Sequence, residues 1–260
     1  MSANLKKRLK NGERLIGTMI NRIDTLDIIP MLKACGMDYV IVDNEHGTWN
    51  PEKIADMALL CNSTGLGALI RIPVLHRPYV QQYLDCGFDG IMLPNCHNAE
   101  IARELVGLCK YVPDGNRGIS IMRGHCGYNA VDDPEEFMRR KNEETIVIVQ
   151  IESRDGLKNV GEIAAVPGVD IALIGPNDLS HSLGIMGQYH NPEFIRATED
   201  VAAACKKAGK WAAIQATNPA AMREYMERGF DFILYGNEVS LLMSAARQCV
   251  GEFKKICSDG

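Results

Sequence analysis

The sequence carries, at positions 36–47, the stretch Gly36-Met37-Asp38-Tyr39-Val40-Ile41-Val42-Asp43-Asn44-Glu45-His46-Gly47. Its apolar part, Tyr39–Val42, shows no alternation of apolar and polar residues. Continuous apolar runs are typical of strands in parallel sheets, which are buried on both faces, whereas a strand with one wet face alternates. The stretch therefore predicts a fully buried parallel strand that runs directly into a loop of charged residues.

Apolar runs of the same kind recur along the whole chain, eight in all: Leu15–Ile20, Tyr39–Val42, Ala68–Ile72, Gly90–Leu93, Ile146–Ile151, Ile171–Ile174, Trp211–Gln215 and Phe232–Tyr235. Between most of them lie stretches with the 3.6-residue spacing of amphipathic helices. These are Thr25–Ala34, Pro51–Cys61, Tyr79–Leu84, Ala99–Leu108, Gly156–Ala165, Pro192–Ala208 and Pro219–Arg228. A repeated order of strand and helix predicts a parallel sheet covered by helices.

Eight such units in 260 residues predict an α/β fold of the (β/α)8 TIM-barrel type rather than a doubly wound sheet, which usually has fewer strands. Proline at a first helical turn supports the helix starts at Asn50-Pro51, Asn191-Pro192 and Asn218-Pro219. The longest part without a strand, Tyr111–Glu144, is expected to form an extended loop after the fourth strand. Because no linker or internal repeat is visible, residues 1–260 are expected to form a single domain.

The composition excludes several other classes of protein. Hydrophobic residues make up 46% and charged residues 23%, which is ordinary for a globular domain and excludes a disordered or coiled-coil chain. A net charge of -5 and a pI of about 5.7 give no attraction for nucleic acids or anionic membranes. The nine cysteines form no C-x-x-C pair, which argues against a structural zinc site or a disulfide framework. The basic amino terminus lacks the apolar segment of a secretory signal, and no apolar run reaches the ~18 residues of a membrane span. We therefore expect a cytoplasmic protein whose ligands are small molecules.

Two carboxylates follow adjacent predicted strands. Glu152 comes directly after Ile146–Ile151, and Asp178 lies a few residues after Ile171–Ile174. Because the ends of neighbouring strands lie ~5 Å apart, both side chains can reach one point, and Gln150 shares the strand face of Glu152. Carboxylate oxygens suit Mg²⁺ or Mn²⁺, which predicts a metal site. The alternative is that each acid caps a helix or carries a surface charge, and for Asp178 alone the two interpretations are balanced.

A histidine and an arginine also stand at predicted strand ends. His46 follows Asp43 by three residues, so the carboxylate could orient the imidazole and raise its basicity for general base catalysis. The alternative for His46 is a loop histidine bonded to the backbone. Arg71 closes the third strand, where it could face a developing oxyanion or form a salt bridge to Glu45 or Glu152.

Two other chemistries are disfavoured by what the sequence lacks. No lysine ends a predicted strand, whereas a Schiff-base mechanism needs a desolvated lysine inside the barrel. The phosphate-binding motif G-x-x-x-x-G-K-[ST] does not occur, so a nucleotide cofactor is not expected.

Five motifs spread over nearly the whole chain resemble, in order, those of the HpcH/HpaI family of metal-dependent class II pyruvate aldolases. They are Gly36–Gly47 as quoted above, Leu69-Ile70-Arg71-Ile72-Pro73, Gly87-Phe88-Asp89-Gly90-Ile91-Met92-Leu93-Pro94, Val149-Gln150-Ile151-Glu152 and Ile174-Gly175-Pro176-Asn177-Asp178-Leu179-Ser180. The resemblance implies a barrel of the phosphoenolpyruvate/pyruvate superfamily. It also implies a homo-oligomer, commonly a hexamer built as a trimer of dimers, in which the last helix packs on a neighbouring subunit.

The implied activity is the cleavage of a 4-hydroxy-2-oxo acid to pyruvate and an aldehyde. Substrates of this type include 2-keto-3-deoxy sugar acids and 4-hydroxy-2-oxoheptanedioate, which arise in the breakdown of carbohydrate acids and aromatic compounds. By the same resemblance, Glu152 and Asp178 would bind Mg²⁺, Mn²⁺ or Co²⁺, and Arg71 would neutralise the enolate oxygen. His46, paired with Asp43, would remove the proton of the 4-hydroxyl through a water molecule.

The resemblance assigns further residues to substrate binding and catalysis. The pyruvyl unit would be held by Gln150, Arg71 and the backbone of Gly175, Pro176 and Asn177. Asp85 matches a catalytic acid of the family. Two segments depart from the family pattern: Asn116–Gly124 after its Arg-Gly pair, and Tyr235–Glu238, where Gly-Ser/Thr-Asp is usual. Both belong to regions that shape the aldehyde side and the subunit contact.

Three alternative functions remain open on the sequence. A malyl- or citramalyl-type thioester lyase would need a basic groove for the coenzyme phosphates, and no cluster of lysine or arginine marks one. An oxaloacetate decarboxylase would form the same pyruvate enolate. A non-catalytic barrel that binds a 2-oxo acid would need no general base, so His46 argues against it.

Overall fold

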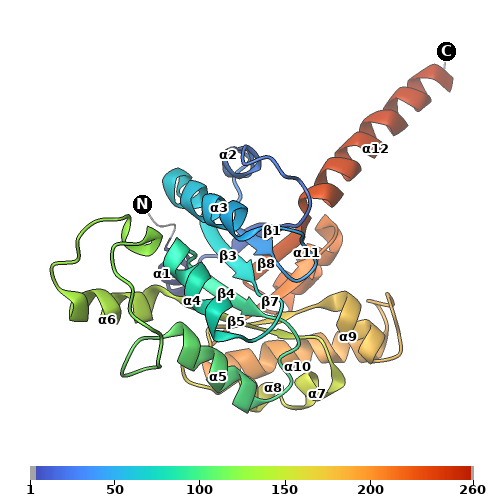
Figure 1. The fold of residues 1–260 in the computed structure, drawn as a ribbon. Coiled ribbons are helices and arrows are strands. Elements are labelled where there is room, and N and C mark those ends of the chain that lie inside the picture. Colours follow the sequence, from blue (N-terminus) through green and yellow to red (C-terminus); the bar gives the residue numbers. More distant parts are fainter. Residues whose placement is uncertain (1–3, 259–260) are drawn as a thin grey trace.

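Eight parallel strands close into a barrel in the computed structural model, which describes residues 4–258 (Figure 1). The strands are β1 (Leu15–Ile20), β2 (Tyr39–Asp43), β3 (Gly67–Arg71), β4 (Gly90–Leu93), β5 (Ile146–Ile151), β6 (Ile171–Ile174), β7 (Trp211–Ala216) and β8 (Phe232–Asn237). Each strand pairs with the next in chain order, and β1 closes against β8. The (β/α)8 barrel predicted from the eight apolar runs is confirmed.

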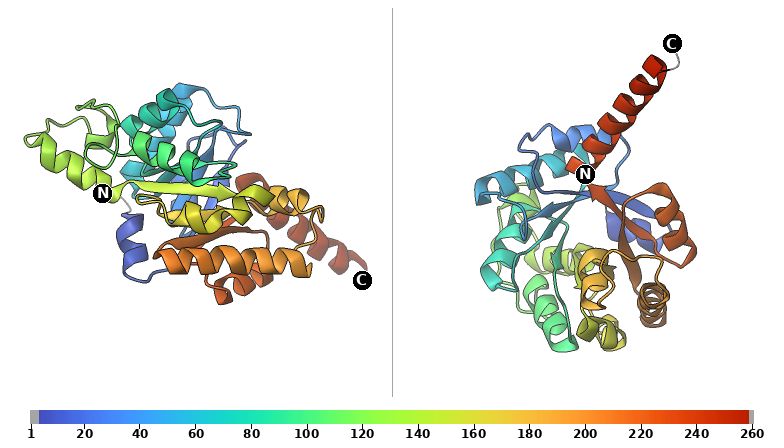
Figure 2. Two further views of the ribbon diagram at one scale, coloured as in Figure 1. Left: turned by 90° about the horizontal axis from the view of Figure 1, so that it is seen from below. Right: turned by 90° about the vertical axis from the view of Figure 1, so that its right-hand side faces the viewer.

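Helices surround this barrel (Figures 1 and 2). They are α1 (Leu5–Lys10), α2 (Ile28–Ala34), α3 (Pro51–Thr64), α4 (Arg77–Cys86), α5 (Ala99–Cys109), α6 (Pro134–Glu144), α7 (Arg154–Lys158), α8 (Val160–Ala164), α9 (Pro176–Ser182), α10 (Pro192–Ala208), α11 (Pro219–Glu227) and α12 (Glu238–Ser258), with a 3-10 turn at Gly124–Cys126. The last helix, α12, extends away from the barrel in every view. No helix within residues 4–258 is both long and apolar enough to cross a membrane.

The strands are buried on both faces because they separate two apolar cores. Within β2, Tyr39 and Ile41 point into the barrel, while Val40 and Val42 pack among the helices. The Tyr39 ring stacks on Phe232 at 4.0 Å between centroids and so fills the interior. Two leucines of α1, both buried, join the same interior cluster and close the amino-terminal end of the barrel. Burial on both sides explains the absence of polar alternation in the sequence.

Strand register brings the polar strand ends together. Asp43, the last residue of β2, is the register partner of Arg71, the last residue of β3. On the far side of the barrel, Ile151 of β5 pairs with Ile174 of β6, so the residues after them, Glu152 and Gly175, are neighbours. The carboxyl end of the barrel therefore gathers the residues that the motifs singled out.

Two expectations about helices need correction. The segment after β4, expected to be an extended loop over Tyr111–Glu144, contains no strand but ends in α6. Its sequence lacks the periodic apolar signal of a helix, because seven of its 11 residues are charged and only Phe137 and Asn142 are buried. The helix expected at Gly156–Ala165 is divided at Asn159 into α7 and α8.

Candidate active site at the carboxyl end of the barrel

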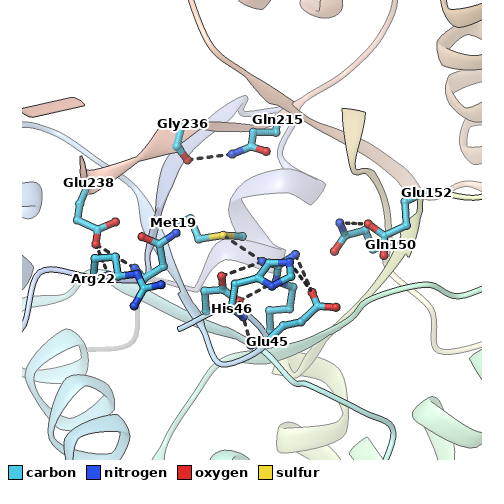
Figure 3. Close-up of polar contacts among 12 residues, drawn as sticks. Met19, Arg22, Glu45, His46, Gln150, Glu152, Gln215, Gly236 and Glu238 are labelled. Carbon is cyan, nitrogen blue, oxygen red and sulfur yellow. Dashed lines mark hydrogen bonds and ion pairs between the residues drawn. The ribbon is translucent and has the colours of Figure 1, made fainter. Parts of the chain in front are cut away.

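A small cavity of about 190 Å³ opens at the carboxyl ends of the strands. Eight residues singled out in the sequence line it: Asp43, His46, Arg71, Gln150, Gly175, Pro176, Asn177 and Asp178. In a (β/α)8 barrel this end carries the active site, because the loops that follow the strands converge there. Figure 3 shows the polar contacts around this cavity.

Arg71 is held by two carboxylates. Its Nε and Nη2 atoms donate to the two oxygens of Asp43 at 2.9 and 2.8 Å, and its Nη1 lies 2.9 Å from Oε2 of Glu45. Arg71 is 6% exposed and Asp43 is fully buried. A guanidinium carries five N–H donors, so one on Nη1 stays available to a ligand. The salt bridge to Glu45, one of the alternatives for Arg71, is present.

The His46 imidazole is not oriented by Asp43, contrary to the expectation from their spacing. Asp43 Oδ1 instead accepts the backbone N–H groups of Glu45 and His46, which fold the loop after β2 over the carboxylate. The carboxylate near the ring is that of Glu45, with Oε2 4.0 Å from Nε2 of His46. The His46 side chain is 69% exposed and lines the cavity, so it can move toward a bound molecule.

Glu152 lies across the cavity from the Arg71 group and is held by neutral donors. Its Oε1 accepts the backbone N–H of Asn95 at 2.6 Å, and its Oε2 accepts Nε2 of Gln150 (Figure 3). Burial raises the pKa of Glu152 to about 7, and the negative charges of Asp178 and Glu45 add to the rise. At neutral pH this carboxyl group therefore exchanges readily between its protonated and ionised forms.

Asp178 stands in the first turn of α9 and faces the same space. Its carboxylate is not the helix cap, because the capping position is Gly175 and no side-chain capping bond is made there. Gly175 is packed so tightly that a Cβ atom at this position would lie 2.5 Å from Nε2 of Gln150 and 2.6 Å from Oε2 of Glu152. The absence of a side chain at position 175 thus lets the backbone before α9 approach Glu152.

The chemistry of these donors fits a hard divalent ion. Within residues 4–258 no group of three or more His, Cys, Asp and Glu side chains forms a complete metal cage. Mg²⁺, however, is commonly bound by one or two carboxylates, with water and substrate oxygens completing its shell. Burial raises the pKa of Glu45, and Asp178 contributes to this rise as it does for Glu152, so the acids around the cavity repel one another. A bound dication would relieve that repulsion. In addition, Oε1 of Gln150 is buried without a hydrogen-bond donor among the described residues.

Asp85 is not brought to this cavity. It lies in α4 on the outside of the barrel, where its Oδ1 accepts Nη2 of Arg117 at 2.7 Å. It lines a different cavity, together with Arg77, Arg123 and Tyr128. The motif match gave a position for Asp85 in the sequence but no information on which side of the barrel wall its side chain faces.

Several residues in or beside the cavity were not singled out as site residues in the sequence. Asn95, which donates to Glu152, follows β4 with a left-handed backbone (φ 49°). Four more line the cavity from β1, β7 and β8 and the residue that follows β1: Met19, Asn21, Gln215 and Asn237. Their position at strand ends was the available signal, but neutral side chains do not stand out as charged ones do.

The closed parallel barrel with this polar cavity at its carboxyl end defines an α/β-barrel protein with a small-molecule site. Residues 23–245 match the model of the HpcH/HpaI aldolase/citrate lyase family. The chain therefore belongs to this family, as its motifs indicated.

Individual relatives agree with this assignment. The chain is 34% identical to a hydroxypyruvate/pyruvate aldolase of Deinococcus radiodurans, over 98% of this chain and 91% of the relative. It is 31% identical to a 5-keto-4-deoxy-D-glucarate aldolase of Klebsiella pneumoniae, over 86% of this chain and 87% of the relative. The crystal structure of an HpcH/HpaI aldolase from Desulfitobacterium hafniense matches with a TM-score of 0.92, at 33% identity and with 96% of both chains covered.

Proposed function

We propose that the protein is a divalent-metal-dependent class II aldolase that reversibly cleaves a 4-hydroxy-2-oxo acid to pyruvate and an aldehyde. An aldolase is a carbon–carbon lyase, and this reaction class is that of the family and of the two named relatives. The observation that carries the proposal is that Asp178 and the buried Arg71 guanidinium line one cavity, and that Glu152 lies directly beside it, against Gln150 and Gly175. That combination serves a reaction in which negative charge develops on a ketone oxygen.

Glu152 and Asp178 are the residues that would hold the ion, which we take to be Mg²⁺, Mn²⁺ or Co²⁺. When bound, a dication supplies a Lewis acid that polarises the 2-oxo group of the substrate. Gln150 lines the cavity and keeps Glu152 in place through its Nε2, and its Oε1 is buried without a partner among the described residues. The substrate carboxylate would be held by the backbone of Gly175, Pro176 and Asn177. Pro176 has no N–H, so the N–H groups of Asn177 and the residue after it, which lie in the first helical turn, are the available donors.

Cleavage then moves one proton and one electron pair. Removal of the 4-hydroxyl proton lets the C3–C4 bond break, the aldehyde leaves, and the bonding pair remains on C3 as the enolate of pyruvate. Arg71 retains its charge and one N–H for the enolate oxygen, in a site where little water weakens the attraction. His46 takes the hydroxyl proton through a water molecule, and return of that proton to C3 completes pyruvate.

The same proposal includes the assembly and setting of the chain. We propose that residues 1–260 form one domain and that the chain assembles as a hexamer, a trimer of dimers, in which α12 packs on a neighbouring copy. Large apolar side chains on α12 support this assembly, because they are more than half exposed: Leu242, Val250, Phe253 and Ile256. The nine cysteines are all free thiols, which supports a reducing, cytoplasmic setting.

The test is release of pyruvate from a panel of 4-hydroxy-2-oxo acids, followed with a coupled pyruvate assay. Activity is expected to vanish after treatment with EDTA and to return on addition of Mg²⁺, Mn²⁺ or Co²⁺. Exchange of the C3 protons of pyruvate with D₂O, which needs no aldehyde, reports formation of the enolate on its own. Full activity after exhaustive chelation would overturn the proposed metal dependence.

A further inference from the structure

The cavity wall divides into two chemically different parts. The part built by β2 to β6 and the segments that follow them carries every charged or titratable side chain that lines the cavity: Asp43, His46, Arg71 and Asp178. The part built by β1, β7, β8 and the residue after β1, which we call the amide wall, consists of Met19, Asn21, Gln215, Leu234 and Asn237. Figure 3 shows Gln215 across the cavity from Glu45 and His46. Since the pyruvyl unit occupies the charged part in the proposed function, the amide wall is left for the carbon chain of the aldehyde.

The amide wall has hydrogen-bonding capacity that the protein does not use. Nε2 of Gln215 donates to the carbonyl oxygen of Gly236 at 3.2 Å, but its Oε1 accepts from no described residue. Oδ1 of Asn237 accepts the N–H of Ser240, whereas its amide nitrogen donates to no described side chain or carbonyl. Oδ1 of Asn21 is buried and without a partner within residues 4–258. Buried polar atoms are nearly always paired, so the unpaired Oδ1 of Asn21 calls for a partner. The free amide atoms of the half-buried Gln215 and Asn237 can supply hydrogen bonds to a ligand that brings donors and acceptors of its own.

The amide wall carries no charge of its own. Glu238, which follows it, is buried, and its Oε1 accepts the backbone N–H groups of Asn21, Arg22 and Ile23 at 3.0, 2.5 and 2.9 Å. This carboxylate therefore anchors the segment that carries Asn21 instead of facing the cavity. Of the lysines and arginines in the described chain, Arg71 alone lines the cavity, and Asp43 and Glu45 already engage it.

From this arrangement we propose that the amide wall selects an uncharged, hydroxylated aldehyde, with Gln215 as the main specificity-determining residue. Hydroxyl groups both donate and accept hydrogen bonds, as the free amide atoms of Gln215 and Asn237 require. An aliphatic aldehyde would leave those atoms unpaired. A second carboxylate inside the cavity would meet no free cation, because Arg22 and Arg247 line the adjoining hollow and not the cavity itself. This inference rests on the proposed function, because it takes the charged part of the wall to be the site of the pyruvyl unit.

The experiment is condensation of pyruvate with three aldehydes in the presence of Mg²⁺: glyceraldehyde, propanal and succinic semialdehyde. Gln215→Met has nearly the same size but no amide, and we expect it to lower the ratio of kcat/KM for glyceraldehyde to that for propanal by roughly tenfold. The matched control is Gln188→Met, an exposed glutamine outside the cavity, which is expected to keep the wild-type ratio. An unchanged ratio in Gln215→Met, or a wild-type preference for succinic semialdehyde, would overturn the inference.

Two further measurements make the outcome decisive. Asn21→Leu breaks no side-chain hydrogen bond of the described structure, so it gives the same ratio test if Gln215→Met fails to fold. Exchange of the pyruvate C3 protons with D₂O by the wild-type enzyme tests the proposed function separately from the amide-wall inference. Exchange together with an unchanged aldehyde ratio refutes the amide-wall inference alone, whereas no exchange in the presence of metal refutes the proposed function and this inference with it.

Discussion

Arg71 and Asp43, the terminal residues of two neighbouring strands, form a buried two-bond ion pair at the floor of the candidate site, with nitrogen–oxygen distances of 2.9 and 2.8 Å. Burying two charges costs free energy that their contact offsets, so loss of Asp43 leaves the buried Arg71 guanidinium with Glu45 as its one remaining carboxylate partner among the described residues. The pair thus belongs to the candidate site and also stabilises the barrel.

Asp43→Asn should therefore destabilise the protein by about 3 kcal/mol, measured by urea unfolding. Replacing Arg71 as well, in Asp43→Asn/Arg71→Met, should recover part of this loss, because the buried guanidinium that has lost its main partner is gone. The control is Glu136→Gln, which breaks an exposed pair with Arg139 and should cost under about 1 kcal/mol. Equal losses for the buried and the exposed pair would contradict this argument.

Binding of the metal ion should depend on pH through Glu152. Its pKa is raised to about 7, chiefly by burial, and only the ionised carboxylate is a ligand. Above pH 7 the affinity for Mn²⁺ should be nearly constant, and below pH 7 it should fall by about tenfold per unit as the proton competes with the ion. Isothermal titration calorimetry between pH 5.5 and 8.5 measures this dependence. Glu152→Gln should bind Mn²⁺ weakly, and its affinity should show no change of slope near pH 7. A change of slope that persists in this variant would assign the titration to another group.

Gly175 should tolerate no side chain. The added methyl group in Gly175→Ala would meet Nε2 of Gln150 and Oε2 of Glu152 at 2.5 and 2.6 Å, so both side chains must shift. Because displaced groups around a metal ligand typically cost 10–100-fold in affinity, Mn²⁺ binding should weaken by about that factor while circular dichroism stays unchanged. Gly161→Ala is the control: it lies within α8, nothing approaches its Cβ position, and it should raise the melting temperature slightly.

The sequence was sufficient to predict the barrel because the same signal, an apolar run without polar alternation, occurs eight times along the chain. Each of the apolar runs became a strand, and the rule that parallel strands end at one face then brought Asp43, Arg71, Gln150 and Gly175 to one cavity. The helix α6 was missed because apolar periodicity, the main signal for a helix, is nearly absent from a segment with so small a buried face.

Details that depend on loop backbone lay beyond the sequence. The spacing of His46 and Asp43 was compatible with a contact to the ring, yet the loop turns so that Asp43 accepts backbone N–H groups and Glu45 lies nearer the imidazole. Asn95 donates its backbone N–H to Glu152, and a backbone bond of this kind cannot be predicted from the residue type. Gln215 stood at the end of a predicted strand, but its role depends on the walls that face it across the cavity.

His46 should contribute to turnover without contributing to metal binding. Its side chain is largely exposed and makes no hydrogen bond that supports Glu152 or Asp178, so His46→Ala should fold normally and bind Mn²⁺ with wild-type affinity. As the proposed general base, its loss should lower kcat for cleavage by about 10²–10⁴-fold. His190→Ala, which removes an exposed histidine outside the cavity, should leave kcat unchanged. Full turnover by His46→Ala would remove it from the mechanism.

The last helix should control assembly. Phe253 and Ile256 are 66% and 73% exposed on a helix that leaves the barrel, which is a large apolar surface for a helix in water (Figure 2). If α12 packs on a neighbouring copy, Phe253→Asp should place an unpaired charge in that contact and shift the mass in analytical ultracentrifugation to smaller species. Lys254→Asp introduces the same side chain beside the apolar stripe and should retain the wild-type mass. A wild-type protein that sediments as a monomer would show instead that α12 is exposed in solution, and the proposed hexamer would be wrong.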